Sequence, residues 1–255
     1  MNQNELKYFK EVQLQFSDAT ALPMGYLLKS LLIKIRRKTW GRLADRGARM
    51  VWTADMVSDA AGPFANVRDY RERQTIRAIL NRIKEKYPVD AACEVGCGYG
   101  RLIMVFEEFA KKVVGFEREK HLVSLARELL PTVDFCKVES LDRLSGFGKG
   151  EFDFAMTCTV LQHLTDDLCR STIEEMKRIA PRAHILLIEK TEDFFTTKNV
   201  RDGGSFISRA RSKEKYAEWM EPYRLVSVSK RVVEPGYFNP NVGECMLFRS
   251  PLLGK

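Results

Sequence analysis

Three glycines on alternate positions follow an acidic residue in the second quarter of the chain. The run is Glu94, Gly96, Gly98 and Gly100, with small apolar residues before it and apolar residues at helical spacing over 102–109. This pattern predicts a strand, a tight loop and a helix. Glycine lets a backbone approach a ligand, and the first N–H groups of a helix face whatever lies over such a loop. We therefore expect a nucleotide-type ligand here.

The spacing of the glycines indicates which ligand. A dinucleotide-binding loop has its third glycine at the sixth position of the motif, where this chain has Arg101. That difference argues against NAD. The next apolar run, 113–116, ends at Glu117, so a second strand would end in a carboxylate where ribose hydroxyls are held.

An acid, a glycine series on alternate positions and a strand-ending acid closely resemble the class I S-adenosylmethionine-dependent methyltransferases. The resemblance implies that the glycine loop contacts the methionine part of the cofactor and that Glu117 accepts hydrogen bonds from both ribose hydroxyls. It also implies that Glu139 and Ser140, after the third strand, recognise the adenine. The cofactor-binding residues implied for S-adenosyl-L-methionine are Glu94, Gly96, Cys97, Gly98, Glu117, Arg118, Glu139, Ser140 and Thr157.

Strand-like and helical segments alternate over 67–255, the part of the chain that the resemblance covers. Alternation of this kind predicts an α/β fold, a doubly wound, mostly parallel sheet, and the resemblance implies seven strands. The strands are expected at 91–95, 113–117, 133–138, 152–158, 184–188, 223–233 and 244–250, and the main helices at 66–86, 101–110, 119–129 and 166–179. The last two strands match the antiparallel strand at the sheet edge in this family. The carboxyl ends of the parallel strands should form the site.

Two residues are candidates for a general base. Methyl transfer from a sulfonium is an in-line displacement, so the protein mainly aligns the reactants and, for an oxygen nucleophile, accepts a proton. His163 follows the fourth strand, and imidazole titrates near neutral pH. Glu189 ends the fifth strand and is the second candidate. The alternatives are a structural histidine and a strand-end salt bridge between Glu189 and Lys190.

The composition of the chain limits the classes of protein to which it can belong. The chain has 255 residues, of which 45% are hydrophobic and 30% charged, which is typical of a soluble globular protein. Neither a signal peptide nor an apolar run of membrane-spanning length is evident, so we expect a cytoplasmic location. Six cysteines without a C-x-x-C pair and three histidines argue against a metal site.

Residues 1–66 lie outside the resemblance and are expected to form an N-terminal helical cap. Between positions 22 and 50 there are eight basic residues and one acid, so this segment carries seven of the eight net positive charges. It also has an apolar helical face. One interpretation is a cap helix with a solvated basic face. The other is a surface that docks on an anionic membrane or a phosphorylated acceptor, which would make the protein membrane-peripheral.

The favoured function is O-methylation of a small molecule or glycan. The alternatives are a nucleic-acid or protein methyltransferase and a catalytically silent nucleotide-binding scaffold of the same fold. Against nucleic acid, the Asn-Pro-Pro-aromatic motif of the methylases that act on amino groups of DNA bases is absent after the fourth strand, where Thr157-Cys158-Thr159-Val160 stands. Basic and aromatic residues are also not interleaved as in RNA-binding modules.

Overall fold

The computed structural model describes residues 65–144, 146–191, 209–231 and 243–254. The cap predicted for residues 1–66 lies outside this part of the chain, except for its last two positions, which begin the first described helix. No helix among the described residues is both long and apolar enough to cross a membrane.

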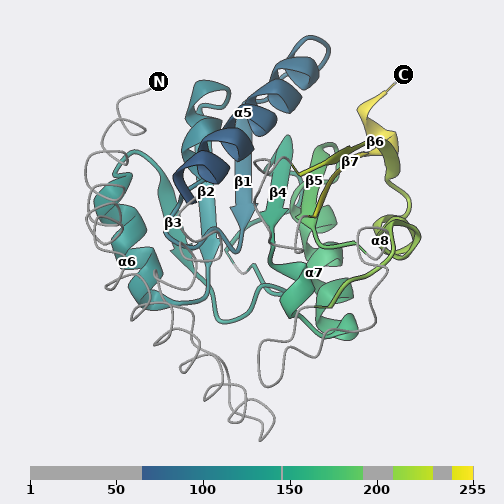
Figure 1. The fold of residues 1–255 in the computed structure, drawn as a ribbon. Helices are drawn as coiled ribbons and strands as arrows, with labels where there is room; N and C mark the ends of the chain where they lie inside the picture. The colour runs from purple at the N-terminus through teal and green to yellow at the C-terminus, as the bar shows by residue number, and fades with distance from the viewer. Residues whose placement is uncertain (1–64, 145, 192–208, 232–242, 255) are drawn as a thin grey trace, which may run out of the picture.

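Seven strands form one sheet. They are β1 Ala91–Val95, β2 Lys112–Glu117, β3 Asp134–Lys137, β4 Phe154–Cys158, β5 His184–Glu189, β6 Arg224–Lys230 and β7 Glu244–Arg249. Their order across the sheet is β3-β2-β1-β4-β5-β7-β6 (Figure 1). Strands β1 to β5 pair in parallel, whereas β7 is antiparallel to both β5 and β6. The predicted seven-stranded, mostly parallel sheet is confirmed.

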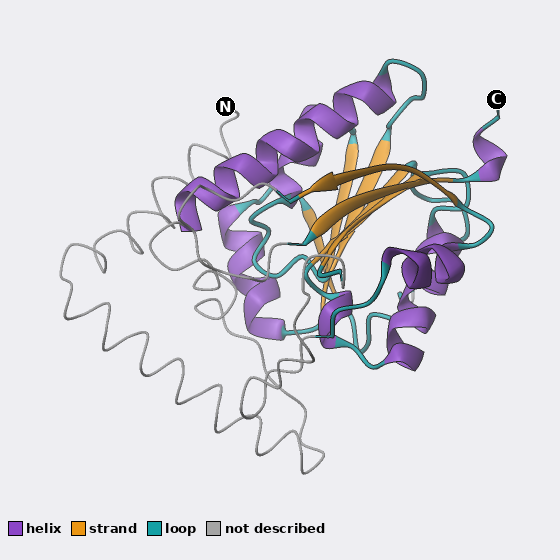
Figure 2. Ribbon diagram, turned by 45° about the vertical axis from the view of Figure 1, so that its right-hand side comes forward, coloured by secondary structure: helices purple, strands orange, loops and turns teal. Residues whose placement is uncertain are grey.

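Helices cover both faces of the sheet, as Figure 2 shows. The bounds are α5 Ala65–Lys84, α6 Lys120–Leu129, α7 Asp166–Ile179 and α8 Lys213–Met220, with 3-10 helices η3 Ile103–Glu108, η4 Leu161–His163 and η6 Pro251–Leu253. The buried side chains of α5, η3 and α6 form one apolar cluster, and those of α7 and α8 form a second. The sheet therefore separates two cores and presents its strand ends between helical layers.

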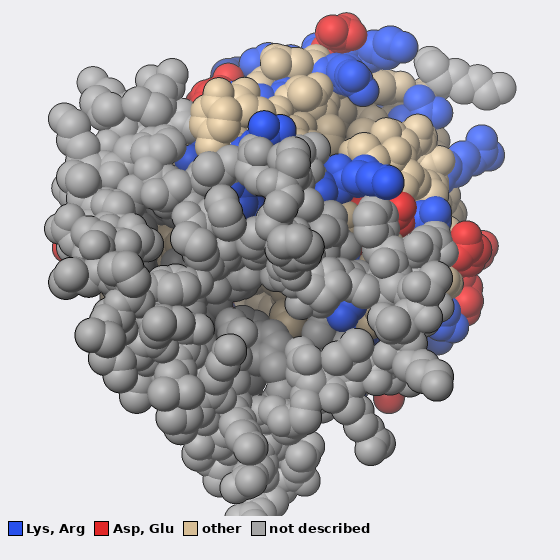
Figure 3. All heavy atoms as spheres, in the orientation of Figure 1, with Lys and Arg blue, Asp and Glu red and all other residues tan. Residues whose placement is uncertain are grey.

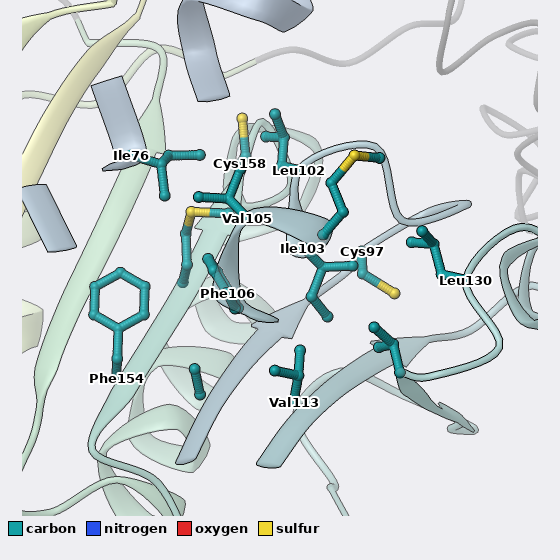
Figure 4. Close-up of a cluster of buried hydrophobic side chains, with 14 of the residues drawn as sticks. Ile76, Cys97, Leu102, Ile103, Val105, Phe106, Val113, Leu130, Phe154 and Cys158 are labelled. Atoms are coloured by element: carbon teal, nitrogen blue, oxygen red, sulfur yellow. The ribbon is translucent and has the colours of Figure 1, made fainter. Parts of the chain in front are cut away.

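The cluster beneath α5 fixes the glycine-rich side of the molecule. Ile76 of α5, Phe106 of η3 and Phe154 of β4 lie in it (Figure 4). The two phenylalanine rings meet edge to face, with their centroids 5.4 Å apart. Because α5 packs on η3, and η3 on β1 and β2, the loop between β1 and η3 is held from both sides.

One helix differs from its prediction. A helix was expected over 101–110 from apolar residues at helical spacing, and the structure has a shorter 3-10 helix, η3, over Ile103–Glu108. Its first four residues, Ile103 to Phe106, are all buried. These four residues are therefore packed between α5 and the sheet, and this part of the segment lacks the solvent-facing stripe of an amphipathic surface helix.

Candidate active site

The loop after β1 needs glycine at two positions, where the backbone is left-handed and a Cβ atom would clash with a neighbouring side chain. Gly96 has φ +75°, and a Cβ atom there would lie 2.5 Å from Cγ2 of Val160. Gly100 has φ +87°, and a Cβ atom would lie 2.7 Å from Cδ1 of Leu130. Both values fall in the left-handed region, which other residues rarely adopt. Gly96 also brings the glycine loop into direct contact with the segment that follows β4.

Glu117, at the end of β2, is joined to this loop through its carboxylate. Oε2 accepts the N–H of Gly98 at 2.9 Å, and Oε1 accepts the N–H groups of Arg118 at 2.6 Å and Glu119 at 2.9 Å. Burial raises the pKa of Glu117, and the three backbone donors oppose that shift. Oε2 keeps one lone pair, so it can accept a hydrogen bond from one ligand hydroxyl beside Gly98.

Two buried oxygens on neighbouring strands have no hydrogen-bond partner among the described residues. They are Oε2 of Glu94, on β1, and Oγ1 of Thr157, on β4. The strands pair there, with Glu94 opposite Met156. Burial raises the pKa of Glu94 to about 8, and the neighbouring Arg101 opposes that shift. Unsatisfied buried oxygens are rare, so this pair suits a ligand with polar hydrogen-bonding groups.

The residues after β3 are more open. Glu139 is exposed and forms an ion pair with Lys137. The hydroxyl of Ser140 donates to Asp142.

The other predicted cofactor residues lie closer to the glycine loop. Arg118 forms an ion pair with Glu119 at 2.7 Å, and the thiol of Cys97 is buried beside Gly115. Glu117, Arg118 and Gly98 are thus brought together, whereas the Glu139 side chain points to solvent.

A buried ionic network that the sequence motifs do not reveal closes this side of the site. Glu72, on α5, forms ion pairs with Arg101 at the end of the glycine loop and with Arg231 after the end of β6. Asp69 pairs with Arg101 at 3.1 Å and Arg68 at 2.7 Å. All five side chains are at least nine-tenths buried. Three arginines hold the pKa of Glu72 well below its usual range, although burial acts in the opposite direction.

The segment after β4 carries His163 and is anchored by Glu189. The Glu189 carboxylate accepts the backbone N–H groups of Val160 at 3.0 Å, Leu161 at 3.1 Å and Gln162 at 3.1 Å. Its side chain is fully buried, and burial raises its pKa to about 7. Thr159, before this turn, has φ +55°. The fifth strand therefore fixes the turn η4, at whose end His163 lies half-buried.

The strand order, the antiparallel β7 between β5 and β6, and the glycine loop after β1 define the class I methyltransferase fold. Residues 93–187 match the model of a family described as a methyltransferase domain. The chain therefore contains a match to a methyltransferase domain and has the fold of the class I S-adenosylmethionine-dependent methyltransferases.

Solved structures of low sequence identity share the fold. The N-methyltransferase NodS from Bradyrhizobium japonicum, in complex with S-adenosyl-L-homocysteine, is 17% identical with a TM-score of 0.58 over 84% of this chain and 99% of that one. Magnesium protoporphyrin IX methyltransferase from Synechocystis, with bound S-adenosylmethionine, is 16% identical with a TM-score of 0.55 over 85% and 96%. A methyltransferase from Leishmania major is 16% identical with a TM-score of 0.61 over 77% of each chain. A search of curated proteins finds no match.

Proposed function

We propose that this enzyme methylates a hydroxyl group of a small-molecule or glycan acceptor and that His163 is the general base. The observation that supports the proposal is the contact between the two halves of the site. Val160 packs against Gly96 of the cofactor loop, and His163 follows Val160 by three residues on the same anchored turn. His163 therefore belongs to the turn whose preceding residue contacts the loop that would hold the methyl donor.

S-adenosylmethionine, when bound, supplies an electrophilic methyl group on a sulfonium. Glu117 would accept a ribose hydroxyl at Oε2, next to the N–H of Gly98. Glu94 and Thr157 would pair their buried oxygens with polar groups of the methionine part. These assignments follow the family resemblance and fit the unmatched acceptors of this site.

His163 is favoured over Glu189 as the base because of what each side chain already binds. Glu189 is fully buried, and its two carboxylate oxygens are held by three backbone N–H groups. Moving a proton onto that carboxylate would weaken the hydrogen bonds that hold the turn. His163 is only half-buried, and imidazole is the side chain that most often serves as a general base, so it can take the proton of an acceptor hydroxyl.

The test combines product identification with a base variant. The enzyme is incubated with labelled S-adenosylmethionine and panels of sugars, lipid-linked glycans, phenols and amines, and the products are identified by mass spectrometry. For the best hydroxyl acceptor, His163→Ala should lower the rate constant of methyl transfer by about a hundredfold or more, with little change in cofactor affinity.

His121→Ala is the matched control, because His121 is exposed on α6. It should keep the wild-type rate. Full turnover by His163→Ala would remove His163 from the mechanism. Transfer to amines alone would overturn the hydroxyl assignment, and no transfer to any acceptor of these panels would favour a protein or nucleic-acid acceptor or a silent scaffold.

A further inference from the structure

The side-chain amide of Gln162 is placed between a backbone donor and His163. Its Oε1 lies 3.2 Å from the backbone N of Lys190, and its Nε2 lies 3.1 Å from Nε2 of His163. Gln162 is buried. The same residue is therefore in contact with the end of β5 and with the histidine at the end of η4.

The partner on β5 decides how the amide is oriented. A backbone N–H can only donate, so the oxygen of Gln162 must face Lys190. The reversed orientation would direct the amide NH2 at that N–H and leave a buried donor without an acceptor. The amide nitrogen must then face His163, and since an amide nitrogen only donates, Nε2 of His163 must accept.

We propose that Gln162 is a positioning residue that holds His163 neutral, with its lone pair on Nε2 and its proton on Nδ1. This inference rests on the proposed role of His163 as base. An imidazolium carries a proton on both nitrogens, and its Nε2–H would point at the NH2 group of Gln162. Protonation therefore costs this hydrogen bond, and His163 stays unprotonated to lower pH than a free imidazole.

Holding the base in this form serves the reaction. A general base must be unprotonated before it meets its substrate. The bond from Gln162 is between neutral groups, so an acceptor hydroxyl can replace the amide at Nε2 at modest cost. The lone pair that will take the proton is thus already on Nε2 before the acceptor binds.

Charged residues of the described part of the chain also lie on the elements packed against this turn. They are Asp166, Glu189, Lys190, Arg209 and Arg211. The side chain of Arg209 donates to the Leu164 carbonyl, and that of Arg211 to the carbonyls of Leu161 and Leu164. Their positive charges oppose an imidazolium nearby and the carboxylates favour one, whereas the amide of Gln162 acts at Nε2 itself.

Gln162→Glu is the sharpest variant, because a carboxylate keeps an acceptor for the Lys190 N–H while it turns the donor facing His163 into an acceptor. Nitrogen NMR of histidine-labelled full-length enzyme without substrate reports the tautomer and the pKa. The chain has three histidines, and the His163 signal is assigned by its loss in His163→Gln. His184 is separable because burial lowers its pKa to about 4.

The wild type should show His163 with its proton on Nδ1 and a pKa below the ordinary value of about 6.5. In Gln162→Glu the pKa should rise by about one unit or more, Nε2 should carry the proton, and the acid limb of kcat should move up by the same amount. Gln162→Met, which removes both hydrogen bonds, should bring the pKa back toward its ordinary value and release the tautomer from the control of the amide.

An Nε2–H tautomer in the wild type, or equal pKa values in the wild type and Gln162→Glu, would overturn the inference. The NMR readout needs no methyl transfer. If it gives the expected tautomer while His163→Ala keeps full turnover, the proposed base is wrong and the role of Gln162 in setting the tautomer stands.

Discussion

A carboxyl group buried without a full set of partners is sensitive to pH. The pKa of Glu94 is raised to about 8 by burial, against 4.5 for a free side chain. Between these two values the unfolded state has released its proton and the native state has not. The stability that Glu94 contributes is therefore present below about pH 4.5 and is lost as pH rises toward about 8.

Glu94→Gln tests this dependence, because an amide has the same shape and does not ionise. The free energy of unfolding of the wild type should fall relative to that of Glu94→Gln by about 1.4 kcal/mol for each pH unit across this window. Urea unfolding of both proteins from about pH 5 to about pH 8 measures the difference. A difference that does not change with pH would mean that Glu94 titrates as a free carboxyl group.

Glu117 should matter for the cofactor more than for the fold. Glu117→Ala removes a charged acceptor that faces the glycine loop and should weaken binding of S-adenosylhomocysteine at least about tenfold, or about 1.4 kcal/mol, by calorimetry. Glu174→Ala is the control, since Glu174 is exposed on α7 and pairs only with Lys177 among the described residues. Unchanged affinity in Glu117→Ala would contradict the assignment of this carboxylate to the cofactor.

At the scale of elements, Glu72 links three parts of the chain. It joins α5 to the end of the glycine loop through Arg101 and to the end of β6 through Arg231. Glu72→Gln keeps the volume but leaves buried arginines without their charge partner, and we expect a loss of about 3–5 kcal/mol in the free energy of unfolding.

Urea unfolding would measure this loss, with Glu218→Gln as the control. Glu218 lies on the exposed side of α8 and pairs with Lys215 at 3.1 Å. Such a surface pair contributes little, so this variant should change stability by less than about 1 kcal/mol. Equal effects of the two variants would show that the buried network contributes no more than a surface pair.

The elements themselves could be predicted from the sequence better than the contacts between them. The strands could be located because apolar runs, glycine and proline mark them locally. The tendency of parallel strands to end at one edge then placed Glu94, Glu117 and His163 on the same side of the sheet. Those inferences need only the periodicity of the chain.

The side-chain network could not be predicted in the same way. Arg101 served as evidence against a dinucleotide, whereas its partner Glu72 lies 29 residues away and Arg231 lies 159 residues from Glu72. Nothing in the spacing of charged residues indicates pairs that only tertiary packing brings together. Likewise Glu189, as a strand-ending acid, was a candidate base, and only its three backbone donors reveal an anchoring role.

At the scale of the whole molecule, positive charge is distributed unevenly. Most of the net charge lies between residues 22 and 50, outside the described part of the chain. Within that part, α5 has six basic and two acidic residues. Lys and Arg side chains are prominent over this helix on the face drawn in Figure 3. We propose that the segment from residue 22 to residue 50 binds anionic membranes or phosphorylated acceptors.

The test replaces Lys34, Arg36, Arg37 and Lys38 together with glutamine. Each basic residue near an anionic surface contributes about 1 kcal/mol, so binding to anionic vesicles should fall steeply with salt and be lost in the variant. Sedimentation with anionic and neutral vesicles measures this, and calorimetry with S-adenosylhomocysteine shows whether the fold is kept. Equal binding to both vesicle types, with activity on soluble acceptors unchanged by the substitutions, would leave the segment as a structural cap.

The position of β7 has a consequence for how the protein is made. All six residues of β5 are buried, and the edge of β5 that faces away from β4 pairs with β7, which the ribosome adds much later. Until then the nascent chain presents an apolar strand with open N–H and C=O groups, the kind of surface on which chains associate. A messenger RNA broken between the codons for Glu189 and Glu244 would therefore yield an aggregation-prone fragment that chaperones would bind.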